Sequence, residues 1–548
     1  MSFVGADLEK DAQKYGLAPE NPIFAGVDGM QEGTVQRSFT GCRKLKARHL
    51  QHPSAYHHGL KKLIISLLRL HLPYRSFTAI GTGLFVGAGS ALATGGTAGL
   101  FLGYTIMATI VYSMMVALGE MTTMFPVFVD PALGFALGWN YWYSWAITIP
   151  TEITAAALVL DYWKGGQNVN VAVWITVFFV VITSFNFMGV QAFGEAEFWF
   201  SLIKIITLLG LMILSIIITS GGVPNSDPSY YPIGFRFWHE TPFKQMNGIP
   251  GSLGRFLSFW TVFLQASFSF LGTEIVALTA GEAENPRRNV PKAIRRVFWR
   301  IVFFYVIGVL CMSLIVSPND PGLINNSGAA ASPWVIGIEK AGIKVLPSII
   351  NAVILVAAFS AGNSDLYAAS RTLYGLACDG QAPAIFSRCL RNGLPIYALI
   401  ATASIGLLAY MNVSTGSTRA FNDLVALSSI TGLINWAVIC FTFLRFYYGA
   451  KAQGLDRNDF PYKAPLQPYA SYFGFIMLCI IIFFNSITIP VFFILWIGYK
   501  LWYKTQFVRK QAMDFDTGRR ELDAMEEEQQ AMRKEPQGWA GKLWDWMM

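Results

Sequence analysis

The chain alternates between long apolar stretches and short polar segments from about residue 77 to about residue 503. A helix of about 20 apolar residues is long enough to cross the hydrocarbon core of a bilayer. The pattern predicts eleven such spans: 77–93, 98–125, 133–160, 171–189, 198–220, 257–281, 298–317, 346–377, 394–411, 423–446 and 470–503.

The last of these stretches is 34 residues long, and Asn485 and Pro490 interrupt it. One helix of that length would measure about 51 Å, which exceeds a hydrocarbon core of about 30 Å. We interpret it as two spans fused together. The pattern therefore predicts an all-α, polytopic membrane protein with about 12 transmembrane helices and both termini on the same side.

Composition agrees with this class. Of the 548 residues 53% are hydrophobic and only 14% are charged, whereas a soluble domain carries roughly 25% charge. Six cysteines without paired spacing predict neither a disulfide framework nor a metal site. We see no Ser–His or nucleotide-binding pattern, so we expect no enzyme activity and no cofactor. The lipid bilayer is an expected partner and nucleic acid is not, because no basic groove is interleaved with aromatic residues.

The placement of Lys and Arg predicts the topology. These residues favour the cytoplasmic side of short loops, and here they cluster before the first span and after the sixth, eighth, tenth and last. All these segments fall on one face if both termini are cytoplasmic. The opposite loops hold two glycosylation candidates, Asn325 and Asn412, although each sequon can also occur by chance.

Two spans carry the same kind of interruption. Residues 80–89 read IGTGLFVGAG, and residues 268–274 read FSFLGTE with a charge in mid-span. Glycine clusters that loosen a membrane helix are tolerated only where they line a cavity. Paired interruptions in corresponding halves are the best sequence indication of a transporter's substrate site. Each lies in the first span of a five-helix unit, which predicts a 5+5 inverted repeat with broken helices 1 and 6.

Several motifs resemble those of one family. The stretch 268–294 (FSFLGTEIVALTAGEAENPRRNVPKAI) resembles the sixth-helix signature of fungal amino acid permeases. The motifs IGTGLFVGAG (80–89), DPALGFALGWNYW (130–142), EAEFWFSLIKI (195–205) and SAGNSDLYAASRTLYGLA (360–377) do so as well. The resemblance is closest to the yeast amino acid transporter family of the amino acid–polyamine–organocation superfamily. It implies a twelve-helix inverted repeat that moves amino acids inward with protons.

A zwitterionic amino acid needs donors for its carboxylate and acceptors for its ammonium. A broken helix offers free N–H groups at the start of its second half, where the helix dipole also favours an anion. Phe270 is a candidate gate, and Ser360, Asn363, Ser428 and Thr431 are expected to line the side-chain pocket. The glycines Gly83 and Gly87 could instead serve only close helix packing. The predicted substrate-binding residues are Ile80, Gly81, Thr82, Gly83, Leu84, Phe268, Ser269, Phe270, Leu271 and Gly272.

Ionisable residues within spans are costly and indicate function by default. Glu152 and Glu274 are candidates for carrying a proton, because burial favours the neutral form of a carboxyl group; either could equally be a structural partner. Lys204 in span 5 resembles the lysine that proton-coupled relatives place where sodium-coupled relatives hold their ion. It could link span 5 to span 1, or it could extend to the interface. Glu120 could be an interfacial residue or a structural gate.

The predicted organisation has three parts: a cytoplasmic tail (1–76) with an atypical basic amphipathic insert, a permease domain (77–510) and a cytoplasmic tail (511–548). The chain departs from the family's pattern near 52–77, 126–130 and 485–490. We predict a proton-coupled amino acid importer of the plasma membrane that works by alternating access. The alternatives are a permease-like amino acid sensor with little flux, and a carrier of another zwitterionic or cationic solute such as carnitine or a polyamine.

Overall fold

The computed structural model describes residues 81–121, 129–188, 190–223, 232–246, 248–274, 298–299, 302–325, 332–390, 393–415, 417–460, 462–484 and 489–513. The chain divides into two compact units. The smaller comprises 1–68 and 389–394, and among its few described residues the Leu390 amide bonds to the Leu394 carbonyl at 2.9 Å. The larger unit comprises 69–388 and 395–548 and holds the long helices.

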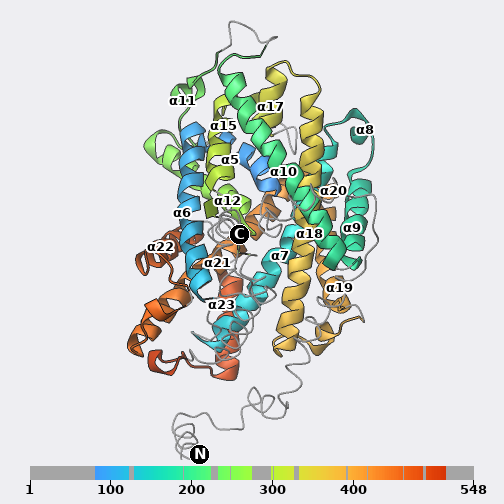
Figure 1. Ribbon diagram of the computed structural model, residues 1–548. Coiled ribbons are helices and arrows are strands. Elements are labelled where there is room, and N and C mark those ends of the chain that lie inside the picture. Colours follow the sequence, from blue (N-terminus) through green and yellow to red (C-terminus); the bar gives the residue numbers. More distant parts are fainter. Residues whose placement is uncertain are drawn as a thin grey trace, which may run out of the picture. The chain divides into compact units, whose positions relative to one another are not determined.

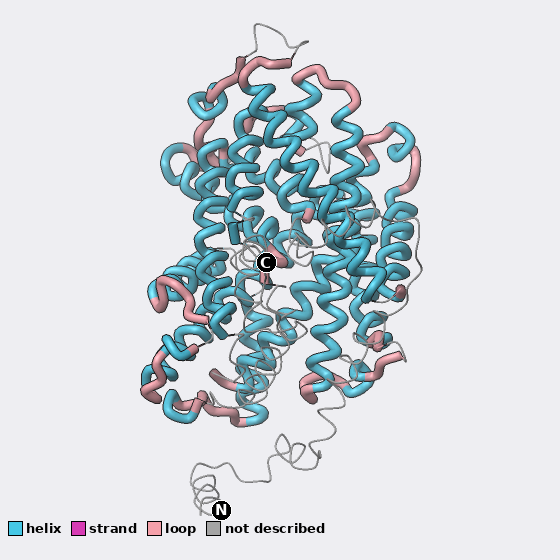
Figure 2. Tube along the Cα trace, in the orientation of Figure 1, coloured by secondary structure: helices cyan, strands magenta, loops and turns pink. Residues whose placement is uncertain are grey.

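The described part of the larger unit is helical and contains no strand (Figure 2). Twelve helical segments within the described ranges correspond to the predicted spans, counting the fused stretch as two. They are η2 with α5 (Gly83–Gly87 and Ala88–Gly95), α6 (Thr97–Met121), α7 (Pro131–Leu160), α9 (Val171–Phe187), α10 (Val190–Thr219), α12 (Gly251–Phe270), η4 with α15 (Val302–Ile307 and Gly308–Ile315), α18 (Leu346–Cys378), α19 with η7 (Ile396–Ile405 and Gly406–Met411), α21 (Ser417–Ala452), α22 (Tyr469–Phe484) and α23 (Ile489–Tyr503).

Short helices lie between these segments and, in one case, after the last of them. They are α8 (Lys164–Gln167), α11 (Arg236–Glu240), α16 (Pro321–Asn325), α17 (Pro333–Lys340), η6 (Ala384–Ser387), α20 (Asn412–Thr415), η8 (Arg457–Asp459) and η9 (Lys510–Ala512).

The predicted fusion of the last two spans is resolved as two short helices. Helix α22 has 16 residues and α23 has 15, which at 1.5 Å per residue makes each about 22–24 Å long. Both are shorter than a typical hydrocarbon core of about 30 Å. Residues 485–488 between them lie outside the described residues, as do 52–77 and 122–128, where the sequence also departs from the family's pattern.

The described helix of the sixth span ends where the sequence predicted an interruption. Helix α12 ends at Phe270, Leu271 adopts extended angles (φ −55°, ψ 143°), and residues 271–274 form a turn. Gly272 has φ +93°, a conformation that glycine adopts at no steric cost. The first span is described from Gly81, where the chain is not helical, and its helix continues through the π-helix η2 into α5.

The interrupted helices lie against each other, and α7 lies against α18. Helix α12 contacts both η2 and α5, while the most extensive helix–helix contact in the described structure joins α7 and α18. In Figure 1, α7 and α18 run side by side next to the first and sixth spans. The members of each pair stand five spans apart, as the two halves of a 5+5 repeat would place them.

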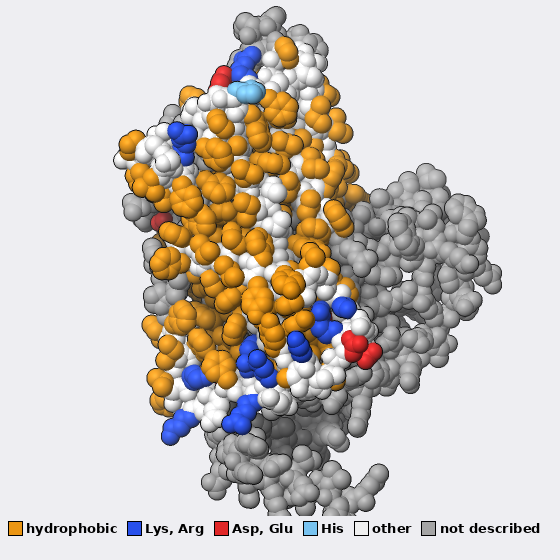
Figure 3. Space-filling view, turned by 90° about the vertical axis from the view of Figure 1, so that its left-hand side faces the viewer, with side chains coloured by type: hydrophobic (Ala, Val, Ile, Leu, Met, Phe, Trp, Pro, Cys, Tyr) orange, Lys and Arg blue, Asp and Glu red, His pale blue; other side chains and the backbone are white. Residues whose placement is uncertain are grey.

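The exterior is apolar over the middle of the helices. Within the described ranges, five helices are long and apolar enough to cross a membrane: Thr97–Met121, Pro131–Leu160, Trp199–Thr219, Leu346–Cys378 and Ala420–Ala452. Ile206, Ile213 and Ile216 on α10 are about 60% exposed. In Figure 3 hydrophobic side chains cover most of the visible face, and Lys and Arg gather along its lower edge. Such a surface suits hydrocarbon rather than water.

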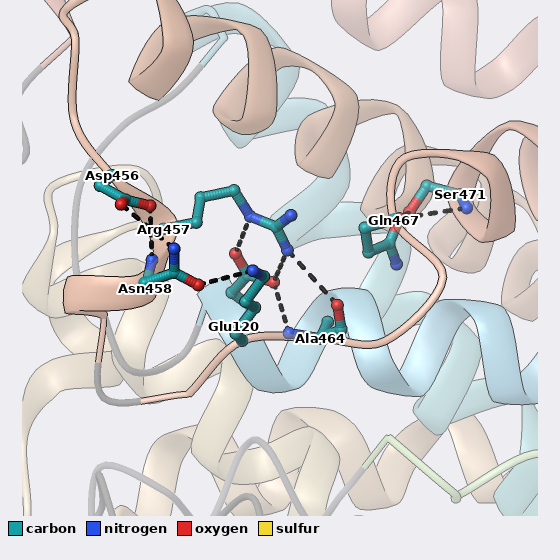
Figure 4. Close-up of polar contacts among 8 residues, drawn as sticks. Glu120, Asp456, Arg457, Asn458, Ala464, Gln467 and Ser471 are labelled. Atoms are coloured by element: carbon teal, nitrogen blue, oxygen red, sulfur yellow. Dashed lines mark hydrogen bonds and ion pairs between the residues drawn. The ribbon is translucent and has the colours of Figure 1, made fainter.

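The loop after α21, which contains η8, is joined to α6 by a buried ion pair (Figure 4). Nε and Nη2 of Arg457 donate to the Glu120 carboxylate, at 2.7 Å and 2.6 Å, and the Ala464 amide adds a third hydrogen bond at 2.8 Å. Glu120 is completely buried. The sequence left open whether Glu120 is an interfacial residue or a structural gate, and its partners identify it as a structural anchor for the loop after α21.

The segment that follows α23 also packs on this end of the molecule. The Val508 amide bonds to the Val129 carbonyl at 2.8 Å, and the Gln453 side chain donates to the Met513 carbonyl at 2.8 Å. Lys500 in α23 pairs with Asp130, the N-cap of α7, at 2.6 Å. The packed chain therefore continues to Met513, three residues beyond the predicted domain end at 510.

Candidate functional site

A pocket opens where the interrupted first and sixth spans meet α7 and α18. Four parts of the chain form its walls: the start of η2, the end of α12 with the turn after it, the middle of α7 and the middle of α18. The residues that line it are Gly81, Gly83, Trp145, Thr148, Glu152, Phe268, Ser269, Leu271, Gly272, Ala361, Ser364 and Asp365.

The first wall is the start of a helix. Because η2 begins at Gly83, its first amide N–H groups have no acceptor within the helix. Gly81 and Gly83 line the pocket, so these donors lie at its edge. A helix start of this kind favours an anion through its free N–H groups and its dipole.

Gly83 also serves close packing, the alternative that the sequence left open. A Cβ on Gly83 would stand 2.6 Å from the Ser269 Cα, so only glycine allows this approach of η2 to α12. At Gly87 the nearest atom, Gln265 Oε1, would be 3.6 Å away, which is ordinary contact. Gly83 therefore has a packing role and also lines the pocket, while its binding role stays a prediction.

The second wall is the end of α12. Phe268, Ser269, Leu271 and Gly272 line the pocket. Of the helix's last carbonyl groups, those of Phe268 and Phe270 accept long hydrogen bonds from the turn amides of Leu271 (3.3 Å) and Thr273 (3.4 Å). A carbonyl oxygen has two lone pairs, so these groups can still accept a hydrogen bond from an ammonium group. The hydroxyl of Ser269 is bonded to the Tyr104 hydroxyl at 2.8 Å, which holds α12 against α6.

Glu152 on α7 reaches across the pocket to the first span. Both of its carboxyl oxygens are 2.9 Å from the Thr82 hydroxyl, which donates to them. Both side chains are buried. Glu152 thus has a hydrogen-bond partner at the broken helix, and it also lines the pocket, so the structure leaves it compatible with both roles that the sequence allowed.

Lys204 on α10 is completely buried, which excludes the alternative that its amine extends to the interface. Its ammonium donates to the Ser360 hydroxyl at 3.0 Å, and that hydroxyl donates to Glu197 at 2.8 Å. Lys204 also lies within electrostatic range of Glu152 and Asp365. The expected link from span 5 to span 1 is therefore indirect. It passes from Lys204 to Glu152, which holds Thr82.

Sequence reasoning missed several residues of the site. Trp145, Thr148, Ser364 and Asp365 line the pocket, and Glu197 completes the Lys204 contact. The rule that flagged Lys204 and Glu152, that an ionisable residue inside a span indicates function, applies equally to Glu197 and Asp365. Trp145 and Thr148 carried no such signal, because aromatic and hydroxyl residues are common in membrane helices.

Some predicted residues do not line the pocket. The Phe270 ring stacks on Tyr305 at a centroid distance of 4.8 Å and lies 5.9 Å from Tyr104. It therefore packs in the core and does not line the pocket, whereas Phe268 does. The gate role of Phe270 stays a prediction. Leu84 is buried in the core, Thr82 contributes its contact with Glu152, and Ile80 lies outside the described residues.

The expected polar lining from spans 8 and 10 also differs. Ser360 is engaged by Lys204, and the Asn363 side chain accepts a hydrogen bond from Asn186 at 2.8 Å. Ser428 and Thr431 donate to carbonyls of their own helix. On α18 the pocket is lined by the neighbours of Ser360 and Asn363, namely Ala361, Ser364 and Asp365.

Glu274 and Asn412 have defined surroundings outside the pocket lining. Glu274 is buried in the turn after α12 and accepts a hydrogen bond from the Trp436 indole at 3.2 Å, so it anchors the end of α12 to α21.

The glycosylation candidate Asn412 is only 3% exposed, which argues against a glycan there. Asn325 ends α16, and its side chain lies outside the described ones. Among the described residues no cluster of three His, Cys, Asp or Glu could hold a metal ion.

Comparison with known proteins shows which family this chain resembles. The model of the amino acid permease family matches residues 77–512. The chain is 40% identical to a dicarboxylic amino acid permease of Saccharomyces cerevisiae, over 92% of this chain and 84% of that protein. It is 37% identical to a proline-specific permease of Emericella nidulans (94% and 98% covered) and 37% identical to a general amino-acid permease of S. cerevisiae (94% and 92%).

These relatives are permeases, which confirms the expectation that the chain is not an enzyme. The match covers every span of the bundle, so this is a multi-pass membrane protein of about twelve helices. Its sequence, its helical fold and its relatives agree: the chain belongs to the amino acid permease family.

Proposed function

We propose that this protein imports amino acids across the plasma membrane by alternating access, coupled to protons. Its relatives are named for amino acids of different kinds: dicarboxylic amino acids, proline and lysine, and some are general permeases. The feature that the site offers to all of them is the pair of helix interruptions, which suits the groups that every amino acid shares.

The pocket complements a zwitterion. The free amides at the start of η2 suit the α-carboxylate, and the carbonyls at the end of α12 suit the α-ammonium. Because the Gly83 contact fixes these two ends against each other, donors and acceptors are held ready before the substrate enters. Pre-organisation of this kind reduces the ordering cost of binding.

The Lys204 cluster supports proton coupling. One amine and three carboxyl groups, Glu152, Glu197 and Asp365, interact in the buried interior. The charge of such a cluster depends on how many protons it holds, and a buried net charge is costly. Glu152 accepts a hydrogen bond from Thr82 at the start of the first described helix. A proton gained or lost by the cluster would therefore change the strength of that contact. A charge that crosses 100 mV gains about 2.3 kcal/mol, enough for roughly fifty-fold accumulation.

The distribution of charge supports the orientation. The end of the helices where Lys and Arg gather (Figure 3) would face the cytoplasm, because such residues favour that side. Both termini would then be cytoplasmic, with 1–76 and 511–548 as tails around the permease domain 77–510.

The observation that carries the proposal is the buried Lys204 amine bonded to α18 beside the pocket. The test is uptake of labelled amino acids by the purified full chain in proteoliposomes, with and without an inward proton gradient. We expect the gradient to raise uptake at least tenfold. In Lys204→Met, which keeps length but removes charge, the gradient should have no effect while substrate binding persists.

The matched control is Lys164→Gln, which removes a charge from an exposed residue of α8 and should behave as the wild type. A Lys204→Met protein that still responds fully to the gradient would refute the coupling role. A wild type that binds amino acids without uptake would indicate the sensor alternative. Uptake competed by polyamines or carnitine but not by amino acids would indicate a carrier of those solutes.

A further inference from the structure

One carboxyl oxygen in the pocket has no hydrogen-bond donor. Asp365, in the middle of α18, lines the pocket and is only 5% exposed. Its Oδ2 is buried without a partner among the described residues. A buried carboxylate that lacks donors is costly, by several kcal/mol, so a donor from a bound molecule would stabilise it.

The charged neighbours of Asp365 have their hydrogen bonds elsewhere. Lys204 donates to Ser360, Glu152 accepts from Thr82, and Glu197 accepts from Ser360. Lys204 attracts the Asp365 carboxylate, whereas Glu152 and Glu197 repel it. With one amine for three carboxyl groups, Oε1 of Glu197 and Oδ2 of Asp365 are both left without a donor among the described residues. Of these two residues Asp365 lines the pocket and Glu197 does not.

On α18, Asp365 lies one helical turn away from the residue that faces the interruption of the first span. On α18 the residue beside the first interruption is Ala361, whose Cβ would be 3.6 Å from a Cβ on Gly81. Asp365 follows it by four residues on the same helix face, a rise of about 6 Å. That distance corresponds to an amino acid side chain of about four non-hydrogen atoms that starts near the helix interruptions.

We propose that Asp365 determines substrate specificity by accepting a hydrogen bond from the end of the substrate's side chain. The preferred substrates are amino acids with about four side-chain atoms that end in a donor: an amide, a hydroxyl, an ammonium or a protonated carboxyl group. This inference rests on the proposed function, because it places the main-chain groups of the substrate at the interruptions.

The test uses three substrates of nearly identical shape. Leucine offers no donor, asparagine offers an amide, and aspartate offers a donor only when its carboxyl group is protonated. Each competes with a labelled amino acid for binding to the purified full chain, at pH 5 and pH 7. We expect asparagine to bind at least tenfold better than leucine, because a site built for a hydrogen bond rejects the analogue that lacks it. Aspartate should bind more tightly at pH 5 than at pH 7, because a larger fraction of its side-chain carboxyl groups is then protonated and can donate.

Two substitutions of similar shape at Asp365 should change the binding preference among these three amino acids in different ways. Asp365→Leu should abolish the advantage of asparagine over leucine. Asp365→Asn keeps an acceptor and adds a donor, so it should retain part of that advantage and improve ionised aspartate at pH 7 at least tenfold. If Asp365→Leu does not fold, the gain of aspartate in Asp365→Asn still decides. The control, Asp379→Asn, makes the same change at the exposed end of α18 and should leave all ratios unchanged.

Three results would overturn the proposal: equal binding of leucine and asparagine by the wild type, an equal loss of all ligands in Asp365→Leu, or no gain of aspartate in Asp365→Asn. Because the readout is binding, these results are independent of flux. Failure of the wild type to take up amino acids would refute the proposed import and leave the binding ratios measurable.

Discussion

At the scale of single residues, the buried charges of this protein divide between fastening and function. Arg457 and Glu120 form a saturated pair, with two hydrogen bonds between them and a third from Ala464. The Arg457 guanidinium also lies 5.0 Å from the centre of the Tyr447 ring, a favourable cation–π distance. Asp365 and Lys204, by contrast, have fewer hydrogen-bond partners: Asp365 lines the pocket, and the Lys204 amine bonds to Ser360, on the same helix as Asp365. A ligand at Asp365 or a proton in the cluster can complete their hydrogen bonding.

Removing one partner of the saturated pair should therefore be costly. We expect Arg457→Gln to lower the free energy of unfolding by about 3–5 kcal/mol, because it leaves Glu120 buried and uncompensated. The measurement is thermal unfolding of the purified protein in detergent.

Asp456→Asn is the matched control, because it neutralises the exposed residue next door. The double variant Glu120→Gln with Arg457→Gln should lose less than the sum of the two single changes. Strictly additive losses, or an Arg457→Gln effect no larger than that of Asp456→Asn, would contradict the assignment.

At the scale of elements, η2 and α12 are in close backbone contact at Gly83. Replacing Gly83 by Ala would place a Cβ 2.6 Å from the backbone of α12 at Ser269. Backbone cannot move aside as a side chain can, so η2 must separate from α12. We expect Gly83→Ala to reduce amino acid uptake at least tenfold.

Gly87→Ala provides the comparison on the same helix. It adds the same methyl group, which meets its nearest neighbour at an ordinary 3.6 Å, so uptake should stay within about twofold of the wild type. Uptake assays on both variants, normalised to the amount of folded protein, check the pair. Equal uptake by the two variants would show that the close approach at Gly83 has no role in transport.

At the scale of the whole molecule, the segment after α23 joins parts of the chain that are far apart in sequence. Residues 504–513 connect α21 through Gln453 and Arg445 with the start of α7 through Val129. Truncation after Met513 leaves these bonds intact, so we expect an unchanged thermal unfolding temperature. Truncation after Tyr503 removes them all and should lower that temperature by several degrees.

Thermal unfolding of the two truncated proteins, which differ by ten residues, measures the contribution of this segment. Similar unfolding temperatures would show that residues 504–513 rest on the molecule without stabilising it.

The sequence by itself determined the class of the protein, its spans and the positions of its interruptions. These follow from local properties: apolar length reports a membrane span, and Gly81, Gly83 and Gly272 report where a helix can open. It also flagged Lys204 and Glu152, since a charge in a span needs a reason wherever the helix packs.

Only the tertiary structure decided which face of each helix meets which neighbour. Phe268 and Phe270 are two residues apart in α12 and alike in chemistry, yet one lines the pocket and the other stacks on Tyr305. The partner of Lys204 lies 156 residues away on α18. Helical periodicity fixes the angle between two side chains on one helix, whereas their surroundings depend on how distant helices pack. For the same reason Asp365 became meaningful only when folding placed it near Gly81 and left one of its oxygens without a donor among the described residues.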